Sequence, residues 1–518
     1  MASNQPKEAQ ALLVEVEEEE VGVEKMHDHD DNLLLYQPVS PSSQCIHTSI
    51  LSLCIIAIAE SEIPINLSKI LATLNDDLLR VNSRFSSIVV TDHKGLQWWK
   101  KVEVDVKDHV VVPSFPSGLS QETYTQHFKN YLSNIAQDQL PEKQPLWEMH
   151  VFMYPTSENT AGTLVFKMHH ALGDGYSIMG ALFSCLKRAD DPSLPLTFPS
   201  SSGSSKSESL SSSGDQLMMK VGLKKMVRFV SGFWNSAAGF AWSVLQSTLL
   251  EDDQTVIRSG TPGVEFMPID VTSVAFSLDH IRQVKSKVGG TVNDVVVGIV
   301  FYGTHLYSQA VAVDKTTTPS RTSNSRRTAL VLLNTRMING YRSLEDMIEK
   351  DLWGNHFSFI HLSIPSYSTS TDQEKVDPLS FILKAKKTIK RNRNSMSIYL
   401  NSALLRLVGS IKGPEAISQY VHSTMRNTSM AISNLAGPVE KMVIAEHPIS
   451  NIYFMVSGCP QSLLCTILSY MGKLTLVMTT ERGFIDSQLL ASCMKEAFKK
   501  IFEEACGKDI VDGTNSSY

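Results

Sequence analysis

Two adjacent histidines open the segment whose residue types are best suited to chemistry. His169 and His170 are followed by residues 171–173, Asp174 and Gly175, and they form the only His-His pair in the sequence. Composition alone gives about 0.4 such pairs, and roughly 0.002 once an acidic residue four positions on and a glycine after it are also required. A histidine whose pKa lies near neutrality can take a proton from an alcohol and return it to a leaving group. We therefore expect a general base here, with a packed histidine pair at a strand end as the alternative.

The other residues of the motif suit supporting roles. Asp174 can orient the loop or pair with a base, and Gly175 can permit a tight backbone turn. Neighbouring side chains on a strand point to opposite faces, so His169 and His170 are a poor pair of metal ligands. A second cluster, His27-Asp28-His29-Asp30-Asp31, lies in a charged tail that offers no rigid frame for a metal. We expect no metal site and no bound cofactor.

The elements that flank the motif are predicted from hydrophobic periodicity. Residues 164–168 alternate apolar and polar side chains, which indicates a strand that ends at the histidine pair. Residues 171–175 have turn chemistry, and residues 176–186 have the apolar spacing of a helix. Loops at strand ends are where a rigid scaffold commonly holds catalytic groups.

Capping signals and apolar runs predict further elements in the second half. Gly289-Gly290 ends one helix, and Thr291 is placed to cap the next, whose first turn holds Asn293 and Asp294. Residues 329–333 and 474–479 are typical of buried strands, and residues 488–505 of a helix. The mixture of strands and helices predicts an α/β or α+β fold.

Composition limits the class of protein. The 518 residues include 47 Lys+Arg and 53 Asp+Glu, for a net charge of −6, and 42% are hydrophobic. A weakly acidic globular chain is a poor nucleic-acid binder, so we expect no nucleic-acid partner. Seven scattered cysteines without a Cys-x-x-Cys pair favour a reducing compartment. Neither a Gly-x-Ser-x-Gly elbow nor a Walker loop is present, which argues against an α/β-hydrolase nucleophile and NTP hydrolysis.

The predicted organisation has two domains joined by a linker. Residues 1–31 read as a disordered acidic tail, and residues 513–518 as a second tail. The first domain is placed at 32–195 and the second at 262–512. Between them, residues 196–261 combine a Ser-rich linker with a helix that is either membrane-associated or linking.

Two segments bear on membrane association. Residues 50–59 are apolar but too short to span a bilayer, so we expect a buried core element there. Residues 229–250 carry no charge, follow Lys220, Lys224, Lys225 and Arg228, and precede three acidic residues. That pattern fits a helix lying in the interface, a helix spanning the membrane, or a core or linking helix.

The motifs together resemble a known family. His169-His170-x-x-x-Asp174-Gly175 is the signature of the CoA-dependent acyltransferase superfamily, which includes chloramphenicol acetyltransferase (CAT) and peptide-synthetase condensation domains. The sequence is more similar to the plant wax ester synthase/diacylglycerol acyltransferase family. The similarity rests on Pro145-Leu146-Trp147, on the Asn293-Asp294 segment and on Ser433-Asn434-Leu435-Ala436-Gly437-Pro438. Residues 353–355 (Trp-Gly-Asn) and the segments 458–461 and 469–474 also resemble family segments. The resemblance extends from about residue 36 to residue 505.

That resemblance implies a fold and a role for each site residue. The fold is α/β, with two CAT-like αβ domains and a tunnel between them. His170 is the general base, His169 supports it, Asp174 shapes the loop by pairing with a basic side chain, and Gly175 lies in the turn. Asn293, Asp294 and Asn434 lie near the tunnel, with helix capping and turn chemistry as the alternative for these three. One segment departs from the plant pattern, because Asn334-Thr335-Arg336 is followed by Met337 where a proline is usual.

The implied partners are lipids. The resemblance implies long-chain acyl-CoA as the donor substrate and a long-chain fatty alcohol, diacylglycerol or both as acceptor, with membrane lipids around the enzyme and no acyl-enzyme intermediate. The implied location is the endoplasmic reticulum membrane with the catalytic domains facing the cytosol, with the plasma membrane as an alternative. Two other functions stay open: acyl transfer to a soluble metabolite alcohol or amine, and non-catalytic binding of lipid or CoA.

Overall fold

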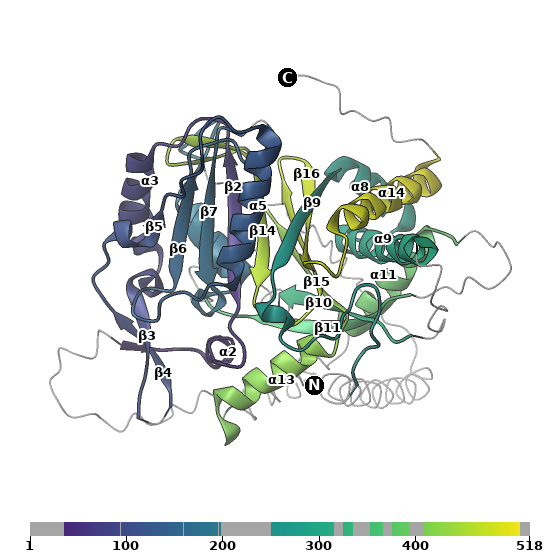
Figure 1. The fold of residues 1–518 in the computed structure, drawn as a ribbon, viewed down its shortest axis with the longest axis horizontal. Helices are drawn as coiled ribbons and strands as arrows, with labels where there is room; N and C mark the ends of the chain where they lie inside the picture. Colours follow the sequence, from purple (N-terminus) through teal and green to yellow (C-terminus); the bar gives the residue numbers. More distant parts are fainter. Residues whose placement is uncertain are drawn as a thin grey trace, which may run out of the picture.

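The computed structural model contains two large mixed β-sheets that lie side by side, each with helices packed against it (Figure 1). It describes residues 36–93, 95–158, 160–194, 196–197, 250–314, 325–334, 353–365, 376–393, 409 and 411–507. The acidic tail with its His27–Asp31 cluster, the predicted helix at 229–250 apart from its last residue, and positions 335–337 lie outside the described residues.

The first sheet has seven strands and is built mainly from the N-terminal half. Their order is β5 (Val110–Val111), β6 (Trp147–Phe152), β7 (Gly162–His169), β2 (Cys54–Ser61), β14 (His447–Ser457), β13 (Met442–Ile444) and β8 (Leu186–Arg188). The β5–β6 pair is parallel and the other pairs are antiparallel. Strands β13 and β14 come from the C-terminal half of the sequence but lie in this sheet. The predicted domains at 32–195 and 262–512 therefore share one sheet. The halves are therefore joined through a shared sheet.

The second sheet has six strands, all from the C-terminal half. Their order is β11 (Phe357–Ser363), β10 (Thr328–Asn334), β12 (Met430–Ala436), β15 (Leu463–Tyr470), β16 (Lys473–Glu481) and β9 (Ile269–Ser277). The β10–β12 and β12–β15 pairs are parallel and the others antiparallel. A small third sheet orders β1 (Tyr36–Pro38), β4 (Gln97–Lys101) and β3 (Ser87–Thr91).

Helices cover the sheets and close the core. The second sheet carries α8 (Leu278–Val288), α9 (Val292–Asp314), α11 (Leu379–Arg393) and α14 (Ser487–Cys506), which enclose one large apolar cluster (Figure 1). Within the described residues, the stretch Val292–Ala312 of α9 is the one helix long and apolar enough to cross a membrane, and 67% of its apolar window is buried inside the fold. It therefore has the character of a core helix.

The remaining helices lie over the first sheet and at the junction of the halves. They are α2 (Pro41–Gln44), α3 (Leu67–Thr73), α4 (Leu79–Val81), α5 (Gln121–Gln137), α6 (Gly175–Ser184) and α13 (Pro414–Arg426), with a π-helical turn at Leu74–Leu78 and 3₁₀ turns at Ser83–Ser86, Val106–His109, His170–Leu172 and Val264–Phe266. Leu132 and Ile135 of α5 share an apolar cluster with Val271 of β9 and Val477 of β16. This helix therefore packs against both halves.

Most elements predicted from periodicity are confirmed. The strands expected at 164–168, 329–333 and 474–479 are β7, β10 and β16, and the helix at 488–505 is α14. The core element expected at 50–59 becomes β2 from Cys54, whose eight residues are all buried. The helix predicted at 176–186 is α6, but it ends at Ser184, and Leu186 belongs to strand β8. Leu186 pairs with Ile444, so strand pairing overrides helical periodicity there.

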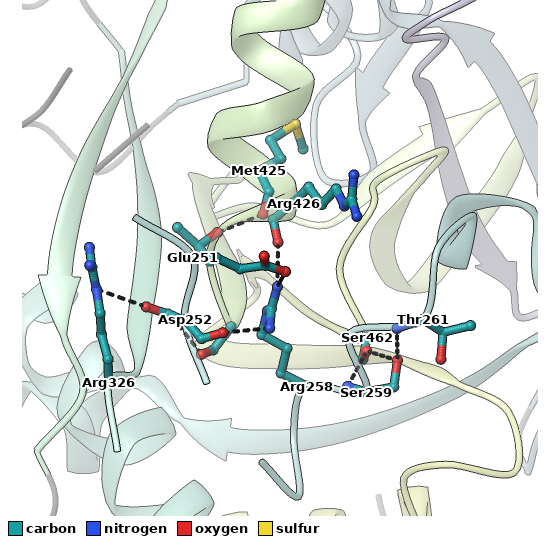
Figure 2. A network of polar contacts seen from close by, with 11 residues as sticks. Glu251, Asp252, Arg258, Ser259, Thr261, Arg326, Met425, Arg426 and Ser462 are labelled. Carbon is teal, nitrogen blue, oxygen red and sulfur yellow. Dashed lines mark hydrogen bonds and ion pairs between the residues drawn. The ribbon is translucent and has the colours of Figure 1, made fainter. Parts of the chain in front are cut away.

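The segment that begins at residue 250 is fastened to the second sheet (Figure 2). The buried carboxylate of Asp252 accepts hydrogen bonds from the backbone N–H and hydroxyl of Thr328, at 2.5 and 2.9 Å, and from Ser429. Arg258 forms an ion pair with Glu251 at 2.5 Å and donates to the Asp252 carbonyl at 2.6 Å. A buried charge is stable only where it is paired or hydrogen-bonded. This network holds the start of the segment that leads to β9.

Candidate active site

The histidine pair stands at the end of a central strand of the first sheet. Strand β7 ends at His169, a 3₁₀ turn covers His170–Leu172, and α6 begins at Gly175. The backbone N–H of His170 donates to the Leu53 carbonyl at 2.8 Å, which fixes the turn against the segment before β2. Both histidines are buried. The strand–turn–helix arrangement predicted from the sequence is confirmed.

Asn355 fixes the tautomer of His170. The Asn355 amide nitrogen donates to the backbone carbonyl of His170 and to the Ser43 hydroxyl, each at 2.9 Å. Because a carbonyl can only accept, this end of the amide must be the nitrogen, and its oxygen Oδ1 lies 2.9 Å from His170 Nδ1. His170 Nδ1 therefore carries the hydrogen and donates it to Asn355. The other ring nitrogen, Nε2, is left as the one that can accept a proton.

The surroundings keep His170 neutral. Burial lowers the pKa of His170 below its usual value, while the Asp174 charge and the hydrogen bond to Asn355 act in the opposite direction. The Phe357 ring contacts the imidazole edge-to-face, with centroids 5.7 Å apart. A neutral imidazole with a fixed Nδ1 proton is the form that a general base requires.

His169 supports the loop. Its Nδ1 accepts from the backbone N–H of Ala171 at 3.1 Å, so Nε2 carries the hydrogen and donates to the Ser52 hydroxyl at 3.1 Å. Burial lowers the pKa of His169 well below its usual value, and the neighbouring His47, whose ring lies 4.7 Å away, acts in the same direction. Both ring nitrogens of His169 are thus engaged. The geometry suits the supporting role that the resemblance implies.

Asp174 and Gly175 shape the start of α6. The Asp174 carboxylate accepts from the backbone N–H of Ser177 at 3.1 Å and from that of His356 at 2.9 Å. The first bond caps α6, and the second ties the motif to the C-terminal half. The basic partner implied for Asp174 stays a prediction. Gly175 is the first residue of α6 and does not adopt a positive φ, and a Cβ there would lie 2.7 Å from Leu435 Cδ1. Its role in the turn stays a prediction.

The segment Trp353-Gly354-Asn355 from the C-terminal half clasps the histidine loop. The Trp353 indole donates to the Leu172 carbonyl at 2.7 Å. The Ser177 hydroxyl donates to the Gly354 carbonyl at 3.0 Å, and the Gly354 N–H donates to the same hydroxyl at 3.0 Å. The catalytic arrangement is therefore completed only where the two halves meet.

A cavity of about 850 Å³, partly open to solvent, lies between the halves at this point. His170, Asp174 and Gly175 line it from one side, and Asn434 lines it from β12. Most other wall residues are apolar, among them Leu53, Ile55, Phe357, Phe359, Met425 and Phe454. A largely apolar wall with a few polar groups suits a substrate with a long hydrocarbon chain.

The structure separates the three residues that were expected near the tunnel. Asn434 lines the cavity and donates through Nδ2 to Asn293 Oδ1 at 3.3 Å. Asn293 therefore contacts the cavity wall through Asn434. Asp294 accepts from the Thr291 N–H at 2.8 Å, and Thr291 Oγ1 accepts from the Asp294 N–H at 3.2 Å. These reciprocal hydrogen bonds confirm Thr291 as the cap of α9. They also show that Asp294 has the capping role that was the alternative to a place near the tunnel.

Sequence reasoning missed the role of Asn355. The Trp-Gly-Asn segment resembles a family segment, but 185 positions separate Asn355 from His170. A polar residue beside a tryptophan and a glycine was the available signal, and it gave no partner. Two other wall residues were not predicted as site residues: Tyr176 lies in the helix predicted at 176–186, and His356 directly follows the segment 353–355.

Family comparisons agree with this geometry. The family model of the wax ester synthase/diacylglycerol acyltransferase (WS/DGAT) catalytic domain matches residues 47–296. The model of the WS/DGAT C-terminal domain matches residues 353–502. The chain belongs to the wax ester synthase/diacylglycerol acyltransferase family. It is an acyltransferase chain in which residues of both domains line one cavity.

Individual relatives extend over almost the full chain. Wax ester synthase/diacylglycerol acyltransferase 4 of Arabidopsis thaliana is 28% identical over 481 residues, which cover 90% of each chain. Number 11 from the same plant is 28% identical over 473 residues, covering 90% of this chain and 94% of the relative.

Solved structures share the fold. The wax ester synthase/diacylglycerol acyltransferase from Marinobacter aquaeolei VT8 matches with a TM-score of 0.55 at 16% identity, covering 90% of this chain and 99% of the other. The cyclization-docking bidomain of EpoB from Sorangium cellulosum matches with a TM-score of 0.53 at 12% identity, covering 96% and 90%. The α/β fold with two CAT-like domains is confirmed.

Proposed function

We propose that this protein transfers a long-chain acyl group from acyl-CoA to the hydroxyl of a long-chain fatty alcohol, with diacylglycerol as a further acceptor. The observation that carries the proposal is a buried, neutral His170 with its Nδ1 proton held by Asn355, on the wall of a largely apolar cavity. The relatives are named wax ester synthase/diacylglycerol acyltransferase, which supports the same substrates.

The proposed reaction needs one base that later acts as an acid. His170 Nε2 takes the proton of the acceptor hydroxyl while the oxygen attacks the thioester carbonyl. The resulting imidazolium is stabilised by the Nδ1–H bond to Asn355, because hydrogen bonds strengthen when the donor is charged. The tetrahedral oxyanion collapses, the carbon–sulfur bond breaks, and His170 protonates the departing CoA thiolate.

Cys459, the one cysteine among the described residues that line the cavity, is poorly suited to form an acyl-enzyme. Cys459 lines the cavity, and burial raises its pKa to about 12, with the Glu265 charge acting in the same direction. A thiol with so high a pKa stays protonated and is a weak nucleophile at neutral pH. A covalent acyl-enzyme on Cys459 is therefore disfavoured.

The proposed location is the endoplasmic reticulum membrane, with the catalytic domains facing the cytosol and the lipid substrates supplied by the bilayer. Both acceptors partition into membranes, which supports a membrane-bound enzyme. Deletion of residues 220–250 is expected to lower the share of the protein in the microsomal pellet. An unchanged share would remove the anchoring role from this segment.

The test uses microsomes from a lipid-poor host that expresses the full chain. Labelled palmitoyl-CoA is offered with hexadecanol, with diacylglycerol, or with no acceptor. Wild type is expected to form acceptor-dependent ester, and His170→Ala is expected to lose it by about 10²- to 10⁴-fold. His280→Ala is the matched control, because His280 lies on α8 and does not line the cavity.

Three outcomes would contradict the proposal. Ester formed equally by wild type and His170→Ala would remove His170 from its role. Ester formed only with water-soluble alcohols or amines would assign the cavity to a soluble metabolite, and the absence of any transfer by folded protein would leave a lipid- or CoA-binding function.

A further inference from the structure

Helix α11 concentrates positive charge on the outer side of the C-terminal half. Six of its 15 residues are basic and none is acidic, although the whole chain has a net charge of −6. The basic residues are Lys384, Lys386, Lys387, Lys390, Arg391 and Arg393. The helix belongs to the group that covers the side of the second sheet pointing away from the first sheet (Figure 1). A strongly basic segment in an acidic protein indicates a local binding surface.

Burial divides α11 into two opposite faces. The buried face lies in the apolar cluster beneath the helix and consists of Phe381, Ile382, Ala385 and Ile389. The exposed face, called the basic face below, consists of Leu383, Lys384, Lys387, Lys390 and Arg391. Spacings of three and four residues keep each set on one side of the helix. The helix is therefore amphipathic, and its polar side is entirely cationic.

The fold gains little from this charge. The side chains of Lys387, Lys390 and Arg391 form no ion pair with any other described residue. Lys387 lies three and four positions before the other two, and like charges at these spacings destabilise a helix. The helix dipole favours cations in the last turn only, so it does not account for Lys387. On α14, by contrast, Lys499 and Lys500 each pair with a glutamate of the same helix.

The end of α8 extends the basic face. Lys386 Nζ donates to the Val288 carbonyl at 3.0 Å, so α11 lies beside the last turn of α8. That turn holds Lys285 and Lys287, and Lys287 is exposed. The basic face itself spans about 12 Å along α11. A small anion is held by donors that converge on it, whereas cations spread over two helices suit an extended anionic surface.

The second sheet separates the basic face from the catalytic cavity. On β11, Phe357 and Phe359 line the cavity, whereas Ile360 and Leu362 lie in the apolar cluster that α11 closes. Neighbouring residues on a strand point to opposite faces of a sheet. The cavity therefore lies across the sheet from α11. The basic face is a surface distinct from the site that holds His170.

Charge and apolar character together indicate the partner. The cytoplasmic leaflet of a membrane is negatively charged and attracts Lys and Arg side chains near its surface. Leu383 is 47% exposed among the basic residues, and an apolar side chain beside cations suits the boundary between headgroups and acyl chains. A nucleic acid offers no such boundary, and the net charge of −6 opposes its approach.

We propose that the basic face of α11, extended by Lys287, binds the anionic headgroups of a lipid bilayer. The proposal rests on the function proposed above for the presence of a bilayer, because that function takes its acceptors from a membrane. It goes beyond that function by assigning the surface and the charge of the lipid that this surface recognises. Binding of this kind is reversible and weakens as salt is added.

The experiment measures how the full chain binds to vesicles, by flotation, without acyl-CoA or acceptor. The vesicles contain phosphatidylcholine alone or with about 30% phosphatidylserine. Wild type is expected to bind the anionic vesicles more tightly, and salt at about 0.5 M should remove most of the difference. The triple variant Lys387→Gln/Lys390→Gln/Arg391→Gln, called the α11 variant, should bind the anionic vesicles about 10²-fold more weakly, because each basic residue contributes about a factor of five.

The variant Lys101→Gln/Lys107→Gln/Lys143→Gln is the matched control. It removes the same charge from three exposed lysines of the N-terminal half, and it should bind both kinds of vesicle as wild type does. Glutamine is a good helix former, and repulsion between like charges is relieved, so the α11 variant should keep its unfolding temperature. If that temperature falls, Lys387→Gln replaces the triple variant, with an expected loss of about fivefold.

Four results would overturn the proposal. The first is equal binding of anionic vesicles by wild type and the α11 variant. The second is an equal loss in both triple variants, which would show a response to net charge alone. The third is a raised KM for palmitoyl-CoA in the α11 variant with vesicle binding unchanged, which would assign the face to CoA. The fourth is a preference for mixed-sequence RNA over vesicles that the α11 variant loses.

The vesicle assay is independent of the acyltransferase assay. Because no substrate is present, a failure of vesicle binding leaves the role of His170 untouched. Conversely, if microsomes that contain the folded protein form no ester, the proposed function fails while binding of anionic vesicles still decides the proposal for α11.

Discussion

Replacement of Asn355 tests the central inference about the site. Asn355 Oδ1 accepts from His170 Nδ1. A neutral hydrogen bond contributes about 0.5–1.5 kcal/mol and one to a charged group about 1.5–3 kcal/mol. The bond should therefore strengthen by about 0.5–2 kcal/mol as His170 becomes an imidazolium. Asn355→Ala should lower kcat/KM by about 2- to 30-fold, at 1.36 kcal/mol for each factor of ten.

Asn355→Asp gives a sharper signature because it changes the pH profile. His170 must be neutral to act as a base, so kcat/KM rises with pH through the pKa of His170, which burial holds below its usual 6.5. A carboxylate 2.9 Å from Nδ1 would favour the imidazolium and raise that pKa by about 1–3 units. The acid limb of the profile should therefore move to higher pH.

The assay measures kcat/KM for hexadecanol with palmitoyl-CoA between pH 5 and 9 for wild type and Asn355→Asp. Asn130→Asp, which adds the same charge at an exposed position on α5, serves as the control and should leave the profile in place. Superimposable profiles for Asn355→Asp and wild type, from protein with an unchanged unfolding temperature, would refute the assigned contact.

Three further predictions concern neighbouring features. Asp294→Ala should lower the free energy of unfolding by about 0.5–2 kcal/mol, through loss of the helix cap, with kcat unchanged in protein that remains folded; a large fall in kcat would assign Asp294 to the site. Lys167→Met removes the buried partner of the partly exposed Glu148 carboxylate and should cost about 1–3 kcal/mol at neutral pH in urea unfolding. The interactions that depress the pKa of Glu148 from 4.5 to about 2 stabilise the fold above pH 4.5 and are lost as pH falls towards 2, so the gap between wild type and Lys167→Met should narrow over that range. Gly175→Ala should lower activity by crowding Leu435, and the double variant with Leu435→Ala should recover it; no recovery would point to backbone conformation instead.

The sequence was sufficient for the local parts of the site. Short stretches of sequence predict the strand that ends at His169, the turn after it and the helix capped by Thr291. This is possible because side-chain periodicity and capping depend on residues close in sequence. The contact between Asn355 and His170 depends on how the two halves pack, and no window contains both residues. The helix predicted through Leu186 was wrong at its end for a related reason, because the strand pairing of Leu186 with Ile444 outweighs its helical spacing.

Gly175 illustrates a second limit. A glycine in a turn is usually explained by a positive φ, which can be guessed from the residues around it. Here the requirement is space, because Leu435 of β12 packs directly against the position that a Cβ would occupy. The sequence therefore indicated the residue type correctly, but the reason for it is visible only in three dimensions.

The place of β14 in the first sheet has a consequence for how the chain is made. Strand β2 pairs with β14 along one edge, yet roughly 400 residues separate Ser61 from Ser457. At about 5–20 residues per second, a ribosome needs roughly 20–80 seconds to cover that distance. For that time the wholly buried strand β2 has one unpaired apolar edge, which is the kind of surface that aggregates. The nascent N-terminal half is therefore expected to need chaperone cover until β14 has left the ribosome.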